Sequence, residues 1–142
     1  MEQPWCFQRQ VVHHHTGQVA NIQGKVSWQD ISKPDAVPTL LYREMGVIQV
    51  ENYTGKATQT YYYQFSSDTI AEVSFHDWRF FYTLDLTTGH CAIRHPCGED
   101  TYDGVCDAIS ETTYQQIWHV TGPRKHYTSH TTFSRPCSET SA

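Results

Sequence analysis

The sequence has few of the features that mark nucleic-acid-binding or membrane proteins. It contains 10 Lys and Arg against 15 Asp and Glu in 142 residues, and its formal net charge is -5. Nucleic-acid affinity depends largely on clustered Lys and Arg, so a nucleic acid is not an expected partner. No apolar window approaches the ~20 residues of a membrane span, and the first five residues lack the basic and apolar regions of a signal peptide. We therefore expect a soluble, cytoplasmic protein with no membrane partner.

Motifs for the common catalytic chemistries are also missing. There is no Gly-x-Ser-x-Gly turn for a nucleophilic serine, no glycine-rich phosphate loop and no dinucleotide-binding fingerprint. Paired carboxylates that would bind a metal are absent as well. The run His13–His15 is expected to be a solvated strand end, because neighbouring residues of a strand point to opposite sides. We therefore expect neither a cofactor nor a resident metal.

The cysteines are odd in number and include no Cys-x-x-Cys pair. In a reducing compartment an odd set is expected to remain as thiols, so the sequence predicts no disulfide. The weaker alternative is structural zinc held by Cys91, His95, Cys97 and Cys106, but this spacing matches none of the familiar closed zinc patterns. The five cysteines are Cys6, Cys91, Cys97, Cys106 and Cys137.

Short runs of β-branched and aromatic residues dominate what is present. Aromatic residues make up 13% of the chain, and turn signals separate the runs about every ten residues, a rhythm typical of an all-β fold. The predicted strands are 5–12, 18–29, 39–49, 56–66, 69–76, 79–86, 90–94, 114–121 and 125–134.

Most links between these strands have the length of hairpin turns. A meander of eight or more antiparallel strands removes its exposed edges by rolling into an up-and-down barrel, and a barrel of this size can hold one small ligand. We therefore predict a single domain, residues 1–142, that forms an antiparallel up-and-down β-barrel with a central cavity. Residues 138–142 are expected to be a disordered tail.

Aromatic rings are predicted on both faces of two strands. In 56–66 the rings at odd positions share one face, opposite Tyr62, and in 79–86 Phe80 and Tyr82 share a face opposite Phe81. One face of these strands is therefore expected to pack on a terminus, a helix or a partner, and a homodimer is one such assembly.

Several local motifs are spread over most of the chain: Trp5 with Phe7-Gln8-Arg9, Tyr42-Arg43-Glu44 with Gly46, Tyr61-Tyr62-Tyr63, Phe75-His76-Asp77-Trp78-Arg79-Phe80-Phe81, His95-Pro96-Cys97, Asp100-Thr101-Tyr102, Trp118, Gly122-Pro123-Arg124-Lys125 with Tyr127, and Arg135. In these motifs the chain resembles a family of small uncharacterised bacterial and fungal proteins with a lipocalin-like (calycin-like) barrel, a domain of unknown function. The resemblance implies a barrel but no particular reaction, because carriers and enzymes share this fold. In similar barrels from natural-product pathways, the cavity often shapes a flexible substrate for ring closure.

The densest group of polar and titratable side chains lies between His90 and Tyr127. His95 and Asp100 could form a general acid–base pair at the mouth of the cavity. The alternative is a hydrogen-bonded turn, in which Asp100 accepts backbone N–H groups and His95 packs under an aromatic ring. The predicted catalytic residues are His95, Asp100, Tyr102 and Lys125.

A second candidate group lies around Tyr42, Arg43 and Glu44. Only one side of this strand can face the cavity, and an inward Arg needs a partner or a ligand, because an unpaired buried charge is costly. An Arg–Glu contact that closes the barrel and recognition of a ligand carboxylate or carbonyl are both open, and Arg9 presents the same two alternatives. The predicted substrate-binding residues are Arg43, Glu44, Tyr63, Phe80, Tyr82, Trp118 and Arg135.

The leading functional hypothesis is a cofactor-independent cyclase or isomerase acting on a hydrophobic natural-product intermediate, for example a pericyclase of the Diels–Alder type. A cavity rich in rings, with a few convergent polar groups, could hold a flexible substrate near its reactive geometry. The alternatives are a non-catalytic carrier of a hydrophobic small molecule and an interaction module that binds a protein.

Overall fold

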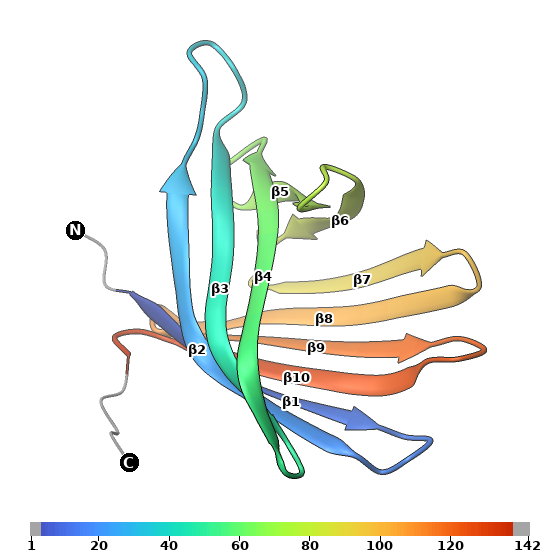
Figure 1. The fold of residues 1–142 in the computed structure, drawn as a ribbon. Helices are drawn as coiled ribbons and strands as arrows, with labels where there is room; N and C mark the ends of the chain where they lie inside the picture. Colours follow the sequence, from blue (N-terminus) through green and yellow to red (C-terminus); the bar gives the residue numbers. More distant parts are fainter. Residues whose placement is uncertain (1–3, 138–142) are drawn as a thin grey trace.

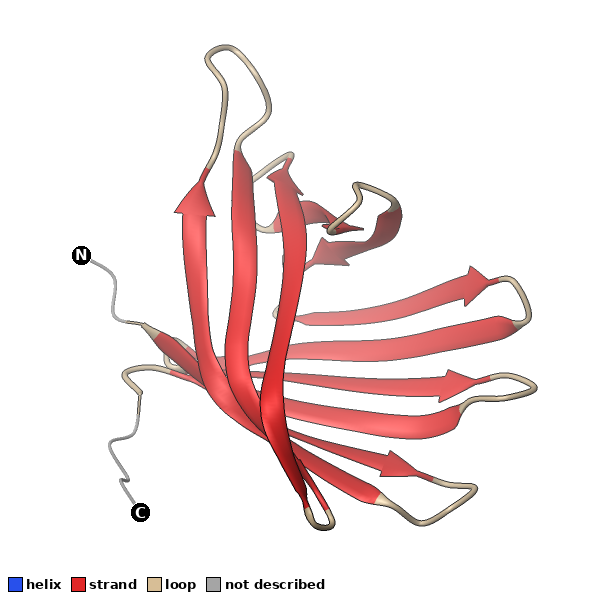
Figure 2. Cartoon of the chain, in the orientation of Figure 1, coloured by secondary structure: helices blue, strands red, loops and turns tan. Residues whose placement is uncertain are grey.

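A computed structural model describes residues 4–137 and folds them into one antiparallel sheet without a helix among them (Figures 1 and 2). The strands form a meander in which β1 also pairs with β10, so the sheet order is β6-β5-β4-β3-β2-β1-β10-β9-β8-β7. The predicted all-β up-and-down barrel is therefore confirmed. The strands are β1 (Trp5–His13), β2 (Val19–Asp30), β3 (Thr39–Val50), β4 (Tyr53–Phe65), β5 (Ile70–Phe75), β6 (Phe80–Asp85), β7 (His90–Cys97), β8 (Asp100–Ser110), β9 (Thr113–Thr121) and β10 (His126–Ser134).

The structure has ten strands where the sequence predicted nine. The missing strand is β8, which lies between the predicted strands 90–94 and 114–121. It pairs with β7 on one side and with β9 on the other, so two ladders hold residues of low strand preference in an extended conformation. The turn before it is made at Gly98, which has a φ of 64°. The predicted disordered tail, 138–142, lies outside the described residues.

The barrel is nearly but not completely closed. Its closure is incomplete because no ladder joins β6 to β7. At one end of this seam the Asp85 N–H donates to Cys91 Sγ over 3.4 Å. Farther along, a register shift in the β5–β6 ladder leaves Phe81 unpaired. Its ring lies 5.3 Å from the ring of His95 and 5.1 Å from that of Trp118, measured between centroids. Side chains rather than backbone hydrogen bonds therefore close the seam.

Two facing glycines allow the backbones of β2 and β3 to approach closely. Gly24 pairs with Gly46 across the ladder. A Cβ atom on Gly24 would collide with the Met45 carbonyl oxygen, and one on Gly46 would lie 3.2 Å from the Phe7 ring. The glycines therefore make room for the backbone and for a core ring.

A pair of stacked rings lies on the outer face of the barrel at β4. Tyr62 of β4 and Trp78 of the β5–β6 turn stack with 3.6 Å between ring centroids. The chain itself therefore covers the outward ring of β4, for which the sequence left a terminus, a helix or a partner open. The homodimer stays a prediction.

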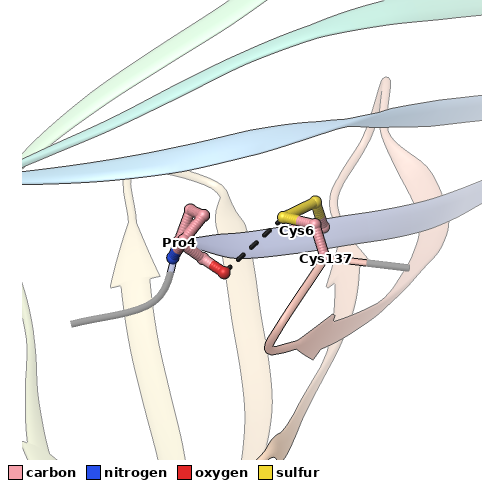
Figure 3. Close-up of a disulfide and its surroundings, with 3 residues drawn as sticks. All are labelled: Pro4, Cys6 and Cys137. Carbon is pink, nitrogen blue, oxygen red and sulfur yellow. Dashed lines mark hydrogen bonds between the residues drawn. A yellow bond between two sulfur atoms is a disulfide. The ribbon is translucent and has the colours of Figure 1, made fainter. Parts of the chain in front are cut away.

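A disulfide joins Cys6, at the start of β1, to Cys137, just after β10 (Figure 3). The prediction of no disulfide is therefore wrong. β1 and β10 are neighbours, and the chain beyond β10 brings the two Cα atoms to 5.1 Å, which suits a disulfide. Because 131 positions separate the two residues, no local pattern marks the pair. Cys91, Cys97 and Cys106 are free thiols.

Two further findings concern the described part of the chain. It contains no helix with the length and apolar character needed to cross a membrane. Within residues 4–137, no group of three or more His, Cys, Asp or Glu side chains is placed to hold a metal ion, so the residues of the zinc alternative are not assembled.

Candidate ligand-binding site

The barrel encloses a cavity of about 750 Å³, within the range of small-molecule sites. Every strand except β7 contributes to its lining, because alternate residues of each strand point inward. Tyr61, Tyr63 and Phe65 of β4 all face it, as the alternation in this strand predicted. The lining reaches from Trp5 and Glu111 at one end of the barrel to Tyr127 at the other, so the cavity is elongated.

An ion pair lies in the wall of this cavity. Arg9 of β1 reaches across β2 to Glu44 of β3, and its Nη1 and Nη2 donate to the two carboxylate oxygens over 2.9 and 2.7 Å. Arg9 Nε donates to Thr131 Oγ1 of β10 over 2.7 Å. The side chains are 14% and 4% exposed, so this bidentate pair is largely withdrawn from water.

A hydroxyl group completes the network around Glu44. Tyr42 donates its phenolic O–H to Glu44 Oε2 over 2.5 Å, and burial together with the Glu44 charge holds the pKa of Tyr42 well above its ordinary value. Burial and the same carboxylate raise the pKa of Tyr61 to about 12. Burial lowers the pKa of Arg9, but the hydrogen bond and charge of Glu44 more than offset this, and its pKa is raised. Arg9 therefore stays charged beside phenols that stay neutral.

A second polar group, uncharged, lies on the β6–β9 side of the cavity. Gln116 Nε2 donates to the Tyr82 hydroxyl over 3.2 Å, and Trp118 Nε1 donates to Gln116 Oε1 over 3.4 Å. Burial and the neighbouring phenol of Tyr63 raise the pKa of Tyr82 well above its ordinary value. A Cβ atom on Gly104 of β8 would lie only 2.6 Å from the nearest atom of the Trp118 ring, so the ring uses space that a side chain at this position would fill. This glycine fixes the plane of the ring in the wall.

The four predicted catalytic residues gather at one end of the barrel. Lys125 Nζ donates to the Tyr102 hydroxyl over 3.3 Å and lies 3.4 Å from Asp100 Oδ2. The hydrogen bond and charge of Tyr102, followed by Asp100, raise the pKa of Lys125. The His95 ring packs 6.1 Å from that of Tyr102, between centroids. Of the four, only Tyr102 lines the cavity.

The predicted substrate-binding residues divide between the cavity and its surroundings. Glu44, Tyr63, Tyr82 and Trp118 line the cavity. Arg43 is exposed, because it alternates with the inward Tyr42 and Glu44.

Phe80 and Arg135 also lie outside the lining. Phe80 is 52% exposed, and the register shift in β6 turns Phe81 inward instead, so Phe81 replaces Phe80 as a candidate wall residue. Arg135 lies at the end of the barrel opposite Tyr102, where its guanidinium sits 4.8 Å above the Trp5 ring and its Nε donates to the Glu111 carbonyl over 3.0 Å.

Sequence reasoning raised Arg9 only as an open alternative and did not select Tyr42, Gln116 or Thr131. A signal for Arg9 was available. Phe7, Arg9 and Val11 alternate with Gln8 and Gln10, so an inward Phe7 places Arg9 inside the barrel. The pairing with Glu44 was not available from sequence, because it spans an intervening strand.

The fold and cavity define a lipocalin-like barrel protein. The chain belongs to the family of unknown function DUF6314, whose pattern matches residues 1–135. Among solved structures it is similar to an S-type phycobiliprotein lyase, CPES, from Guillardia theta. The similarity has a TM-score of 0.64 at 9% identity and covers 96% of this chain and 89% of that chain, which establishes a shared fold. No curated protein matches the chain.

Proposed function

We propose that the barrel binds one small, largely apolar and unsaturated molecule in its central cavity. The observation that carries this proposal is the cavity of about 750 Å³, whose wall is rich in aromatic rings and contains the fixed Arg9–Glu44 pair. Aromatic walls favour flat ligands, because rings stack or meet edge to face. A few placed polar groups in an apolar cavity are the usual means of orienting a bound molecule.

The three tryptophans in the cavity wall provide the test. Trp5, Trp28 and Trp118 line the cavity, whereas Trp78 stacks on the outer surface. We expect a bound chromophore to quench the fluorescence of the Trp78→Phe variant as strongly as that of the unchanged protein, and Trp118→Ala to weaken binding at least tenfold. The dimethyl ester of a bilin is a reasonable first probe, because the structural neighbour is a phycobiliprotein lyase and the ester carries no carboxylate. Absence of saturable quenching by bilins, retinoids and acyl esters alike would count against a binding cavity.

A second candidate function is conversion of the bound molecule, by a cofactor-independent cyclase or isomerase. The specific observation in its favour is the Tyr102–Lys125 hydrogen bond at the end of the cavity, with Asp100 beside the ammonium. A phenol that accepts from an ammonium is a stronger donor toward a substrate carbonyl, because linked hydrogen bonds polarise one another. In this proposal Tyr102 polarises the substrate, Lys125 and Asp100 position Tyr102, and His95 supports the Tyr102 ring from outside the cavity.

The two candidates differ in what leaves the protein. We expect an enzyme to return an isomer of equal mass, and a carrier to return its ligand unchanged. Compounds from producing-cell extracts should therefore be compared before and after incubation by denaturing mass spectrometry. Tyr102→Phe should slow an isomerase at least tenfold with little change in affinity. An unaltered compound in every extract, although bound in native mass spectra, would reject the enzyme and retain the carrier.

A further inference from the structure

We infer that the cavity selects an uncharged ligand bearing a carbonyl or another neutral acceptor oxygen, and that Arg9 binds that oxygen. This inference rests on the proposed binding function and adds the chemical class of the ligand to it. Two features of the cavity support it: the balance of charge among the lining residues, and the N–H groups of Arg9 that the ion pair does not use.

The interior of the cavity is electrically balanced. Arg9 and Glu44 neutralise each other through a bidentate contact, and the other ionisable lining groups away from the ends are phenols. Burial, as the largest cause, raises the pKa of Tyr42, Tyr61 and Tyr82, so these phenols are neutral. Apart from the phenols, the remaining ionisable lining groups are His13 and Glu111, which lie toward opposite ends of the barrel. No uncompensated cation among the lining residues is therefore available at the centre to hold a ligand anion.

The network offers donors rather than acceptors. A guanidinium carries five N–H groups. Arg9 gives one from Nε to Thr131 and one each from Nη1 and Nη2 to Glu44. The two remaining N–H groups have no partner among the described residues, and Arg9 lines the cavity. Both oxygens of Glu44 already accept hydrogen bonds, one of them also from Tyr42. A ligand oxygen that accepts hydrogen bonds is thus the matching group.

Glu44 also explains why that oxygen should be neutral. An unpaired Arg fork binds a carboxylate through two parallel hydrogen bonds, and here Glu44 occupies that position. A ligand carboxylate at the remaining N–H groups would lie near the Glu44 carboxylate and would lose its hydration without gaining an unpaired cation. A ketone, ester or amide oxygen loses far less hydration and can accept a hydrogen bond from a remaining Arg9 N–H group.

The experiment compares matched pairs that differ only in charge. Methyl cinnamate, methyl dodecanoate and methyl retinoate are each titrated against the corresponding acid at pH 8 (about four units above an ordinary carboxyl pKa), with intrinsic tryptophan fluorescence as the readout. For the pair of best-fitting length we expect the ester to bind at least tenfold more tightly than the acid. Glu44→Gln should reverse this preference, because it leaves Arg9 as an unpaired cation. Asp103→Asn, which breaks the exposed ion pair of Asp103 with Arg94, is the matched control and should change nothing.

The outcomes separate this inference from the binding proposal. An acid that binds as tightly as its ester overturns the neutral-ligand inference and leaves the binding proposal standing. Failure of every ester and every acid to bind overturns both. Should Glu44→Gln not fold, the double variant Arg9→Gln with Glu44→Gln replaces it: it should still prefer the ester but bind it at least fivefold more weakly. Ester affinity unchanged in the double variant would reject the role of Arg9.

Discussion

At the scale of single residues, the Arg9–Glu44 pair depends most on the hydrogen bonds that surround it. Both side chains are largely buried, and the four hydrogen bonds that they make with each other, with Thr131 and with Tyr42 leave neither charge uncompensated. Breaking such a pair strands a charge in a low-dielectric interior, whereas removing both charges does not.

Glu44→Gln is therefore expected to lower the free energy of unfolding by about 3–5 kcal/mol, measured by urea denaturation. The double variant Arg9→Met with Glu44→Leu should lose less than this single variant, because no charge is left without a partner. Asp103→Asn is the control and should change stability by less than about 1 kcal/mol, because its ion pair with Arg94 is exposed. Equal losses in Glu44→Gln and Asp103→Asn would contradict the buried-pair interpretation.

At the scale of the strands, adjacent phenylalanines in β6 have opposite roles. Phe81 is buried and contacts residues of β7, β8 and β9, whereas Phe80 is exposed. Phe81→Ala should cost about 3–5 kcal/mol in urea unfolding, because it removes the ring that fills the seam. Phe80→Ala should stay within about 0.5 kcal/mol of the unchanged protein. Similar effects for the two variants would mean that the register shift does not place Phe81 inside.

Strands β4 and β6 show which features of the fold could be predicted from the sequence. The inward face of β4 followed from simple alternation, as did the general course of most strands, because a half-buried strand needs period-2 patterning. In β6 that rule selected Phe80, since a register shift inverts the alternation and depends on the neighbouring strand. The catalytic candidates Asp100, Tyr102 and Lys125 were grouped from sequence, and the structure places them together. Their roles remain a prediction.

At the scale of the whole molecule, the buried phenols set an upper limit to the pH range of stability. The pKa of Tyr61 is raised to about 12, and burial raises those of Tyr42 and Tyr82 well above their ordinary value. Below about pH 10 both folded and unfolded chains keep these phenols protonated. Above it the unfolded chain ionises first, so each such tyrosine should reduce the free energy of unfolding by about 1.4 kcal/mol per pH unit until its folded-state pKa is reached.

Circular dichroism and phenolate absorbance should therefore change together as the pH rises above 10, since the inner phenols ionise on unfolding. Tyr61→Phe should make the loss of stability less steep. Full ionisation of every tyrosine while the circular dichroism remains native would contradict this expectation.

The Cys6–Cys137 disulfide should act on the unfolded chain, where it restricts the two ends. Replacing both residues by Ser is expected to lower the free energy of unfolding by about 2–4 kcal/mol, measured by urea denaturation. Cys97→Ser, at an exposed free thiol, is the control and should have little effect. Unchanged stability of the double variant would show that the bridge adds nothing beyond the β1–β10 ladder.

The bridge also bears on location, because disulfides persist mainly in oxidising compartments. Thiol alkylation at the moment of cell lysis would test the cytoplasmic expectation. Labelling of Cys6 and Cys137 in cells would favour a reducing compartment, and protection of both would oppose it.

The strands of the barrel are held together less strongly at the seam between β6 and β7 than at any other neighbouring pair. Elsewhere the strands are joined by ladders, and parting them means breaking consecutive backbone hydrogen bonds. At the seam, only a few rings and a sulfur contact must be displaced. The barrel can therefore behave as a cylinder split along one side, whose bore widens for a bulky guest while every strand pair keeps its register.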